Sequence, residues 1–557
     1  MTTSDARPSP LPSSAARPVV WSIAGSDSGG GAGIQADLRA FGLMGVHGCT
    51  AIAAVTAQNS VAVTHIEALS PEVLDAQLAA LAADLPPAVI KTGMLASADN
   101  VRVVARWVRA LRAQYPQSPP ALVVDPVRRA STGAELGGEA LRMALLAELL
   151  PLATLIKPNE AEAAWLVGRS GTPPELATDL RRRGAGAVVI TGGDAHPGTG
   201  TPQAAQWSLD WLDTPQAHGW LVLPRVDTPH NHGTGCTFAS AAAAALARGY
   251  CEADAVVIAK MLSTDSLVHG YAAGRGAGPV HAQSGFALQP ARLPLLVPAL
   301  DRLPGHAVHA GRPAFPALTQ AWMGLYPVVD SADWVERTLA AGVRTVQLRI
   351  KAEALDALAA QGIDAQAYLD EQIARSVQAA RAVQAQLFIN DHWQAALSHG
   401  AYGVHLGQED LFSADLDALR RSGIRLGLST HSYWEVCRAH AEAPSYIACG
   451  PIHATVTKDM PWWPQGPGNL AYWSAVLDEP VVGIAGMDEA RSLEAVRCGA
   501  QGVAVLRGIT HAADPEAAIA GLAQAIEAGR GSPPLAPPPL ARPTLRGPVA
   551  VDVFPSA

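Results

Sequence analysis

The sequence predicts an α/β protein with two large domains, a three-layer α/β/α domain followed by a TIM (β/α)8 barrel. At 557 residues the chain is too long for one hydrophobic core. Short apolar runs alternate with alanine-rich helical stretches in both halves, as in domains that cover a sheet with helices. Between residues 276 and 318 this periodicity is lost, and prolines and glycines collect there. We therefore place the domain boundary near residue 300.

The expected organisation has five parts. These are a loose tail at 1–18, the first α/β domain at 19–282, a linker at 283–320, the barrel at 321–528 and a proline-rich tail at 529–557. The first tail is rich in Pro, Ser and Ala and has no apolar stretch of the kind that a signal peptide needs.

Seven apolar runs in the first half are expected to be strands. They are residues 19–25, 50–57, 88–95, 121–127, 154–159, 187–193 and 220–224. Runs that are apolar on both faces and separated by helical text indicate a mostly parallel sheet with helices on each side.

Eight apolar runs in the second half match the strand count of a TIM barrel. They are residues 325–330, 345–350, 387–391, 402–407, 425–430, 446–452, 481–486 and 502–508. Polar residues or glycines stand near their carboxyl ends, at Asp330, Arg349, Asp391, Gln408, Ser429, Gly450, Gly486 and Arg507. Active sites of such barrels lie at this rim.

Composition excludes several classes of protein. A formal net charge of -9 disfavours nucleic-acid and anionic-membrane partners. Six cysteines without C-x-x-C spacing disfavour zinc sites and disulfide frameworks, so a cytoplasmic enzyme is expected. No run approaches ~18 apolar residues, so no membrane span is expected. A homo-oligomer remains open.

Two glycine motifs compete for a nucleotide in the first half. Gly31, Gly33 and Ala36 satisfy G-x-G-x-x-A, but no carboxylate follows about 20 residues later, which weakens a dinucleotide interpretation. Gly233 and Gly235 lead directly into an alanine-rich helix. Exposed N–H groups at that helix start would stabilise a transferring phosphoryl group.

Cys236 follows the second motif, in the first turn of the expected helix. A thiol in this position commonly has a lowered pKa, because the helix dipole favours the thiolate. The alternative is a small buried thiol. Its place directly after G-T-G favours the functional interpretation.

The first half resembles the hydroxymethylpyrimidine and phosphomethylpyrimidine kinases of the ribokinase-like fold. The resemblance rests on AGSDSGGGAGIQADLRAF, VTAQNS, KTGML, VVDPV, KPNEAEA and HGTGCT, and spans about residues 19–280. It implies that the glycine loop closes over the pyrimidine while ATP lies towards GTGC. It also implies roles for single residues: Asp37 and Gln58 bind the aminopyrimidine beside Met94, Asn159 and Glu162 position Mg-ATP, and Cys236 deprotonates or positions the attacking hydroxyl.

Two residues depart from the pattern of these kinases. Arg128 stands where methionine is frequent after D-P-V, and Thr191 where lysine often precedes the glycines of VVITGG. Arg128 could supply the positive charge that Thr191 lacks.

Charged residues at the barrel rim suit a metal and a polyanion. Asp391 and Asp410 are carboxylates on successive loops, and Arg349, Lys351 and Lys458 are cations. Such a set can share the charge of Mg²⁺ and a pyrophosphate.

The second half resembles thiamine phosphate synthase over residues 322 to about 527. The matching text includes VQLRIK, LFINDHWQAALSHGAYGVHLGQEDL, GLSTHS, YIACGPIHATVTK and GAQGVAVLRGI. This family joins hydroxymethylpyrimidine pyrophosphate to thiazole phosphate and releases pyrophosphate. The resemblance implies that Asp391 and Asp410 hold Mg²⁺, that Arg349, Lys351, Asn390 and Lys458 contact pyrophosphate, that Gln347 and Ser429 line the pyrimidine side, and that Thr455, Thr457 and Gly486 receive the thiazole phosphate.

Four residues depart from this second pattern. Ile350 replaces a usual acid, Ala454 a common proline, Ala485 a common second glycine and Arg507 an expected serine. Arg507 strengthens or blocks phosphate binding, and guanidinium geometry favours the first.

The sequence predicts one enzyme for three consecutive steps, with hydroxymethylpyrimidine, its phosphate and pyrophosphate, thiazole phosphate and ATP as its small molecules. Alternatives are a pyridoxal-type kinase, a thiazole tautomerase-like barrel, and a half that binds ligand without turnover.

Overall fold

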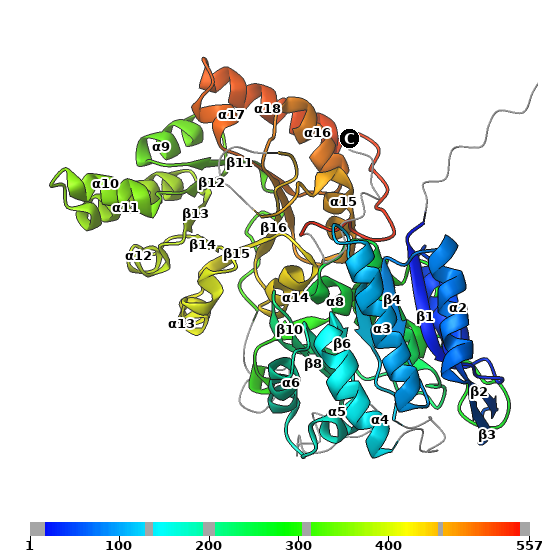
Figure 1. Cartoon of the computed structure of the whole chain (residues 1–557). Coiled ribbons are helices and arrows are strands. Elements are labelled where there is room, and N and C mark those ends of the chain that lie inside the picture. The colour runs from blue at the N-terminus through cyan, green and yellow to red at the C-terminus, as the bar shows by residue number, and fades with distance from the viewer. Residues whose placement is uncertain (1–16, 129–137, 193–205, 303–313, 455–460, 546–557) are drawn as a thin grey trace, which may run out of the picture.

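The computed structural model describes residues 17–128, 138–192, 206–302, 314–454 and 461–545. It shows an open sheet covered by helices, drawn in blue to green, beside a closed barrel, drawn in green to red (Figure 1). The expected three-layer ribokinase-like domain and TIM barrel are both confirmed. Within the described residues, no helix is both long and apolar enough to cross a membrane.

The first domain has a ten-stranded sheet in the order β10-β9-β8-β7-β6-β5-β4-β1-β2-β3. Its centre, from β2 to β7, is parallel, and antiparallel strands extend both edges. The strands are β1 Val19–Gly25, β2 His47–Gln58, β3 Val63–Ala68, β4 Val89–Thr92, β5 Ala121–Val124, β6 Leu155–Ile156, β7 Val188–Thr191, β8 Trp207–Asp213, β9 His218–Pro224 and β10 Leu295–Val297.

Eight α-helices accompany this sheet. They are α1 Gly33–Leu43, α2 Pro71–Asp84, α3 Ala98–Gln114, α4 Glu139–Ala144, α5 Glu160–Val167, α6 Pro173–Arg182, α7 Thr234–Ala247 and α8 Glu252–Val268. Helix α7 is buried throughout residues 237–247, and its alanines allow it to lie against the sheet, α1 and α8. This packing fixes the start of α7, where the G-T-G motif stands.

The segment expected as a linker contributes to the first domain. Residues Leu295–Val297 form β10, which pairs antiparallel with β9 and buries Leu296 and Val297. Three residues are too short for a periodicity signal, so the sequence pattern did not indicate this strand.

The second domain is a closed barrel of eight parallel strands, with β11 paired to β18. Every run expected in this half forms a strand: β11 Gly324–Val329, β12 Thr345–Leu348, β13 Gln386–Asn390, β14 Gly403–Leu406, β15 Arg425–Thr430, β16 Tyr446–Cys449, β17 Val481–Ile484 and β18 Gly502–Val505. The surrounding helices are α9 Ala332–Ala340, α10 Ala352–Ala360, α11 Ala365–Ala382, α12 Trp393–Ser398, α13 Leu416–Ser422, α14 Tyr433–Ala441, α15 Gly466–Val476, α16 Glu489–Arg497, α17 Arg507–Thr510 and α18 Pro515–Arg530.

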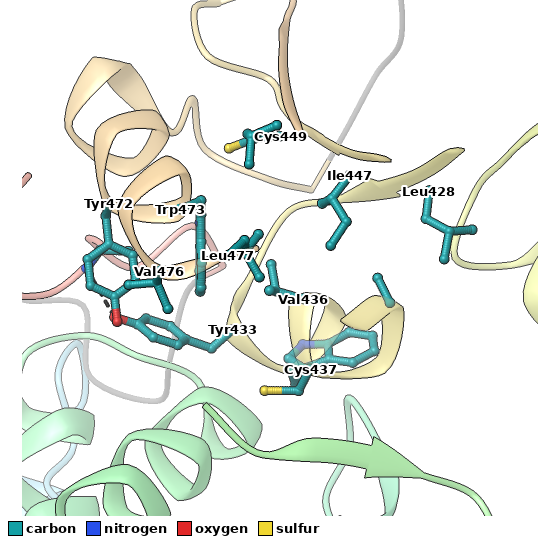
Figure 2. Packing of buried hydrophobic residues seen from close by; sticks show 14 of the residues in the cluster. Leu428, Tyr433, Val436, Cys437, Ile447, Cys449, Tyr472, Trp473, Val476 and Leu477 are labelled. Carbon is teal, nitrogen blue, oxygen red and sulfur yellow. Dashed lines mark hydrogen bonds between the residues drawn. The ribbon is translucent and has the colours of Figure 1, made fainter. Parts of the chain in front are cut away.

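The two domains share a hydrophobic core. One cluster of buried residues runs from the first domain into the barrel, where α14 packs against α8 and β10. On the barrel side, Tyr433 of α14 meets Tyr472 and Trp473 of α15, with ring centroids 5.7 and 4.8 Å apart (Figure 2). Across the boundary, the Trp434 N–H donates to Asp254 Oδ1 at 3.0 Å. The two domains are therefore not packed as independent units, because part of their buried apolar surface is shared.

The C-terminal segment packs against both domains as far as it is described. Leu540 and Ala541 are buried in the shared core. The Tyr250 hydroxyl of the first domain donates to Ala541 O, and the Ala541 N–H donates to the Tyr433 hydroxyl of the barrel. The segment expected as a proline-rich tail is therefore partly ordered. Its apolar residues Leu540 and Ala541 pack between the two domains.

Candidate active sites

A pocket of the first domain lies at the carboxyl ends of β1, β2 and β4, beside the start of α7. Ligands of open parallel sheets bind at this edge. Gln58, Met94 and Cys236, all predicted from the sequence, line it. The other lining residues are Ala24, Gly25, Ser26, Asp27, Ala32, Gly33, Thr56, Lys91, Gly93, Val127 and His232.

The two glycine motifs meet backbone to backbone at this pocket. Gly233 caps α7 with φ +87°, and a Cβ there would lie 2.0 Å from the Gly31 carbonyl oxygen. Gly33 begins α1 with φ +56°, and its Cβ would lie 2.4 Å from the Gly25 oxygen. Only glycine fits either position. The start of α7 is thereby held beside the pocket, which Cys236 of its first turn lines. Phosphoryl binding by its first N–H groups stays a prediction.

Asp27 organises the glycine loop, and the sequence analysis did not single it out. Its carboxylate accepts N–H bonds from Gly29, Gly31 and Ala32 at 2.8–3.0 Å, and it pairs with His232 Nε2 at 2.9 Å. Burial raises the pKa of Asp27, but the hydrogen bonds from His232 and the backbone outweigh it and leave the pKa lowered. The aspartate inside G-S-D-S-G and the histidine before G-T-G were the available signals.

Asp37 does not line the pocket, contrary to the expectation that it binds pyrimidine. It is fully buried, and Lys91 Nζ donates to both of its oxygens at 3.0 and 2.9 Å. The hydroxyls of Ser22 and Ser240 occupy the same oxygens at 2.5 and 2.6 Å. With its acceptors engaged, Asp37 holds Lys91 at the pocket wall instead.

The thiol of Cys236 lies in the predicted first turn of α7, but its pKa is not lowered. Burial raises the pKa of Cys236 to about 11, and the lowering by Lys91 is countered by the negative charges of Asp37 and Asp125. The thiol is therefore protonated at neutral pH in the free protein. Local charge and burial here outweigh the helix dipole.

Asn159 and Glu162 begin α5 and form a capping box. The Asn159 side chain accepts the Glu162 N–H at 2.8 Å, and Glu162 accepts the Asn159 N–H at 2.9 Å. Glu162 is 8% exposed, and burial raises its pKa in spite of the Lys157 charge. Lys157 pairs with Asp125 at 3.1 Å. The sequence signal for this buried network was the presence of Asp125 and Lys157 directly after short apolar runs.

The two departures lie beside this network. The Arg128 N–H donates to Glu162 Oε1 at 3.4 Å, and its guanidinium lies over the Trp165 ring at 5.8 Å. Thr191 ends β7 and bridges to Asn159.

The barrel brings five of its predicted residues to the carboxyl ends of its strands. Gln347 and Arg349 stand at the end of β12, Asn390 and Asp391 at the end of β13, and Ser429 near the end of β15. Lys351 precedes α10 and is exposed. Thr455, Thr457 and Lys458 lie outside the described residues.

Asp391 and Asp410 are neighbours across two loops. Partial desolvation and the adjacent Asp410 carboxylate raise the pKa of Asp391 more than Arg349 lowers it. Asp391 also adopts φ +62°, a left-handed conformation that aspartate adopts more readily than most residues with a side chain. Asp410 Oδ2 accepts the Gly407 N–H at 2.9 Å. Two crowded carboxylates fit a cation that relieves their repulsion.

Mg²⁺ fits this pair of carboxylates. The described residues hold no cluster of three or more His, Cys, Asp or Glu arranged for a metal. Mg²⁺ commonly takes one or two protein carboxylates and completes its shell with water and substrate phosphates, so two are sufficient.

A chain of buried polar side chains crosses the barrel below the rim. Gln347 Nε2 donates to Tyr326 OH at 3.0 Å, and the hydroxyls of Tyr326 and Tyr446 are 2.8 Å apart. His405 joins Tyr446 to Ser429, with 2.7 Å from Nδ1 to Tyr446 OH and 2.9 Å from Nε2 to Ser429 Oγ. The sequence analysis did not predict Tyr326, Tyr446 or His405, whose only signal was a polar group within apolar strand text.

The four departures in the barrel differ in burial and backbone conformation. Ile350 is buried, Ala454 ends a described range, and Ala485 precedes Gly486 with φ +84°. Arg507 begins α17 and is exposed.

Two family matches and several relatives correspond to these domains. Residues 27–281 match the phosphomethylpyrimidine kinase family, and residues 325–509 match the thiamine monophosphate synthase family. The chain is 43% identical over 267 residues to the hydroxymethylpyrimidine/phosphomethylpyrimidine kinase of Synechococcus elongatus, covering 47% of this chain and 96% of that protein. It is 50% identical over 214 residues to the thiamine-phosphate synthase of Serratia proteamaculans, covering 38% of this chain and 95% of that protein. A solved pyridoxal kinase from Staphylococcus aureus with ADP is 30% identical over 48% of this chain and 93% of that chain, with a TM-score of 0.42.

Proposed function

Because the chain belongs to the hydroxymethylpyrimidine/phosphomethylpyrimidine kinase family in its first half and to the thiamine-phosphate synthase family in its second, we propose that it carries out three consecutive steps of thiamine biosynthesis. The first domain phosphorylates hydroxymethylpyrimidine to its phosphate and then to its pyrophosphate, with ATP as the donor. The barrel joins that pyrophosphate to thiazole phosphate. The observation that carries the proposal is the presence of both families, for successive reactions, in one bifunctional enzyme.

In the kinase reaction, the substrate hydroxyl oxygen attacks the γ-phosphorus of ATP, the bond to the bridging oxygen breaks, and ADP leaves with the electron pair. The first N–H groups of α7, held by Gly233 and Gly235, stabilise the charge of the transferring group. Gln58 and Met94 hold the pyrimidine. Asn159 and Glu162 orient the nucleotide end through the α5 capping box and its buried Lys157.

Cys236 faces the same pocket and positions the attacking hydroxyl. Burial raises the pKa of its thiol to about 11, which favours a positioning role over deprotonation of the hydroxyl.

In the synthase reaction, the methylene C–O bond breaks with the electron pair going to pyrophosphate, and the thiazole nitrogen lone pair forms the C–N bond of thiamine phosphate. Gln347 and Ser429 orient the pyrimidine, while Arg349, Lys351, Asn390 and Lys458 neutralise the departing pyrophosphate. Thr455, Thr457 and Gly486 receive the thiazole phosphate, and Arg507 adds a guanidinium near it.

Asp391 and Asp410 are the proposed ligands of Mg²⁺. When bound, the metal supplies positive charge for the pyrophosphate oxygens. The two aspartates would hold it at the rim, where the charge of Arg349 also acts on Asp391.

The remaining proposals concern the cellular location, the partners and the oligomeric state of the protein. We place the reactions in the cytoplasm, with small molecules as the substrates and no nucleic-acid partner. The net charge of -9 supports the absence of a nucleic-acid partner. A homo-oligomer is compatible with it.

The decisive experiment is a one-pot assay with purified chain, hydroxymethylpyrimidine, thiazole phosphate, ATP and Mg²⁺, in which thiamine phosphate is followed by chromatography. We expect product, and we expect its loss in both Cys236→Ala and Asp391→Ala. Accumulation of pyrimidine pyrophosphate without thiamine phosphate contradicts the barrel assignment. Conversion of added pyrimidine pyrophosphate alone contradicts the kinase assignment. Pyridoxal in place of hydroxymethylpyrimidine tests the pyridoxal-type alternative, for which we expect slower turnover.

A further inference from the structure

The chain of polar side chains inside the barrel is unusual for its position. Tyr326 and Tyr446 are 1% and 0% exposed, and His405 is 7% exposed. Barrel interiors are normally filled by branched apolar residues, because buried polar groups cost free energy unless they are hydrogen-bonded. Here every hydroxyl and both imidazole nitrogens have a partner, and the two ends of the chain, Gln347 and Ser429, belong to the proposed pyrimidine side.

His405 can act in this chain only as one donor and one acceptor. Both ring nitrogens face hydroxyl groups, at 2.7 and 2.9 Å. Burial, with a smaller contribution from the charge of Arg349, lowers the pKa of His405 to about 3, so the ring is neutral. A neutral imidazole carries a proton on one nitrogen and a lone pair on the other. If Nδ1 accepts a hydrogen bond, Nε2 must therefore carry the proton and donate one.

The direction of the chain follows from its first member. Gln347 Nε2 donates to Tyr326 OH, which leaves the Tyr326 proton to be donated to Tyr446. Tyr446 then donates to His405 Nδ1, so the imidazole proton lies on Nε2 and is donated to Ser429 Oγ. The Ser429 proton is left for the site. In the described residues Gln347 Oε1 accepts no hydrogen bond, so this carbonyl oxygen is left as an acceptor.

We propose that Tyr326, Tyr446 and His405 are positioning residues that set the hydrogen-bond polarity of the synthase site, so that Gln347 accepts and Ser429 donates. This inference rests on the proposed synthase function. An aminopyrimidine edge carries an amine that donates and a ring nitrogen that accepts, which complements this arrangement. The corresponding 4-oxo pyrimidine carries a carbonyl and a ring N–H. Its carbonyl would face the accepting oxygen of Gln347, and its N–H would face the donating hydroxyl of Ser429. Specificity then comes from groups that never touch the substrate.

The test compares binding of two ligands to the full chain with Mg²⁺ and without thiazole phosphate. The ligands are hydroxymethylpyrimidine pyrophosphate and its 4-oxo counterpart, measured by calorimetry. We expect the wild type to bind the amino compound at least ~10-fold more tightly, because the oxo compound leaves buried polar groups unpaired. Tyr446→Phe interrupts the chain, and we expect the ratio to fall to within about threefold.

A matched control removes a hydroxyl beside the same aromatic cluster but outside the chain. Tyr402 packs on Phe388 at 5.5 Å, and its hydroxyl bonds to Gln386 and Thr319. Tyr402→Phe is expected to keep the wild-type ratio. We expect His405→Ala to lose the preference for the amino ligand over the 4-oxo ligand. His405→Gln is expected to keep part of this preference, because its amide has both a donor and an acceptor. In steady state, Tyr446→Phe should raise KM for the pyrimidine pyrophosphate and leave KM for thiazole phosphate unchanged.

Three results would overturn the proposal: equal binding of both ligands by the wild type, an unchanged ratio in Tyr446→Phe, or an equal rise of both KM values. If Tyr446→Phe does not fold, judged by circular dichroism, Tyr326→Phe breaks the same chain one link away and decides in its place. Failure of the synthase function has a different signature, in which the wild type binds neither pyrophosphate and forms no thiamine phosphate.

Discussion

The two sites differ in the residues that adopt left-handed backbone. At the kinase site, Gly233 and Gly33 do so, and an added Cβ would lie 2.0 and 2.4 Å from carbonyl oxygens. At the synthase rim Gly486 adopts φ +69°, but Asp391 and Ala485 adopt φ +62° and +84° while carrying side chains. The kinase site thus depends on backbone packed against backbone, whereas the rim also places side chains in left-handed backbone. Steric changes should damage the first site, and changes of charge or polarity the second.

The sharpest test of this contrast is Gly233→Ala. The added Cβ collides with the Gly31 oxygen and disfavours the helix start, so we expect kinase activity to fall more than ~10³-fold. Synthase activity with supplied pyrimidine pyrophosphate should be unchanged. Gly42→Ala in α1, where a Cβ meets nothing within 4 Å, is the control. Normal kinase turnover in Gly233→Ala would show that the two glycine motifs need not touch.

The reciprocal test at the rim is Asp391→Asn, which keeps the shape and removes the charge. We expect synthase activity to fall about 10²-fold and the Mg²⁺ concentration for half-maximal rate to rise, because one of two carboxylates is lost. Kinase rates serve as the internal reference. Asp330→Asn, at the exposed end of β11, is the matched control. An unchanged Mg²⁺ requirement would remove Asp391 from the metal site.

The pH dependence of Cys236 labelling tests whether burial or the helix dipole controls its thiol. With the pKa raised to about 11, only ~10⁻³ of the thiol is ionised at pH 8, so alkylation by iodoacetamide should accelerate about tenfold per pH unit from 8 to 10. Peptide mass spectrometry reads the site, and Cys236→Ala provides the blank. Rapid labelling at pH 7 would instead support the dipole-lowered thiolate that the sequence alone predicts.

The sequence predicted what depends on local pattern. All eight barrel strands, the parallel strands of the sheet and the glycine motifs were identified, because periodicity and glycine spacing are local signals. Gln58, Met94 and Cys236, which the sequence singled out, line the pocket, while their roles stay predictions.

What the sequence missed depends on contacts between distant segments. Asp37 changed from a pocket residue to a buried partner of Lys91, which is 54 residues away. The Tyr326–Tyr446 pair joins strands 120 residues apart. The strand β10 and the packed segment around Ala541 acquire structure only through partners elsewhere in the chain. The hydrophobic periodicity of a single segment carries no information about which distant residues it will contact.

The shared core raises the question of whether the two regions are independent, and Asp254→Asn addresses it. Burial raises the pKa of Asp254 from 3.8 to about 7 at the interface. The unfolded chain ionises this group near pH 4 and the native chain near pH 7, so native stability is lost as pH rises between them. Asparagine still accepts the Trp434 N–H. We expect the variant to gain about 2 kcal/mol relative to wild type from pH 5 to pH 8.

Thermal unfolding of both proteins at the two pH values measures this effect. Exposed Asp84→Asn is the control, with no pH-dependent gain expected. Equal differences at pH 5 and pH 8 would mean that the Asp254 carboxyl does not titrate at the interface.

The smallest expected effect belongs to Ala485, where a glycine can replace a side-chain-bearing residue that adopts left-handed backbone at the rim. A non-glycine residue at φ +84° costs ~1 kcal/mol, while glycine adopts this conformation freely but loses more entropy on folding. We expect Ala485→Gly to stabilise the barrel by about 0.5 kcal/mol in denaturant unfolding. Ala374→Gly, at an exposed position in the middle of α11, should destabilise it by a similar amount. Destabilisation by Ala485→Gly would mean that the methyl group contributes more than the left-handed backbone costs, and that the rim is packed rather than strained.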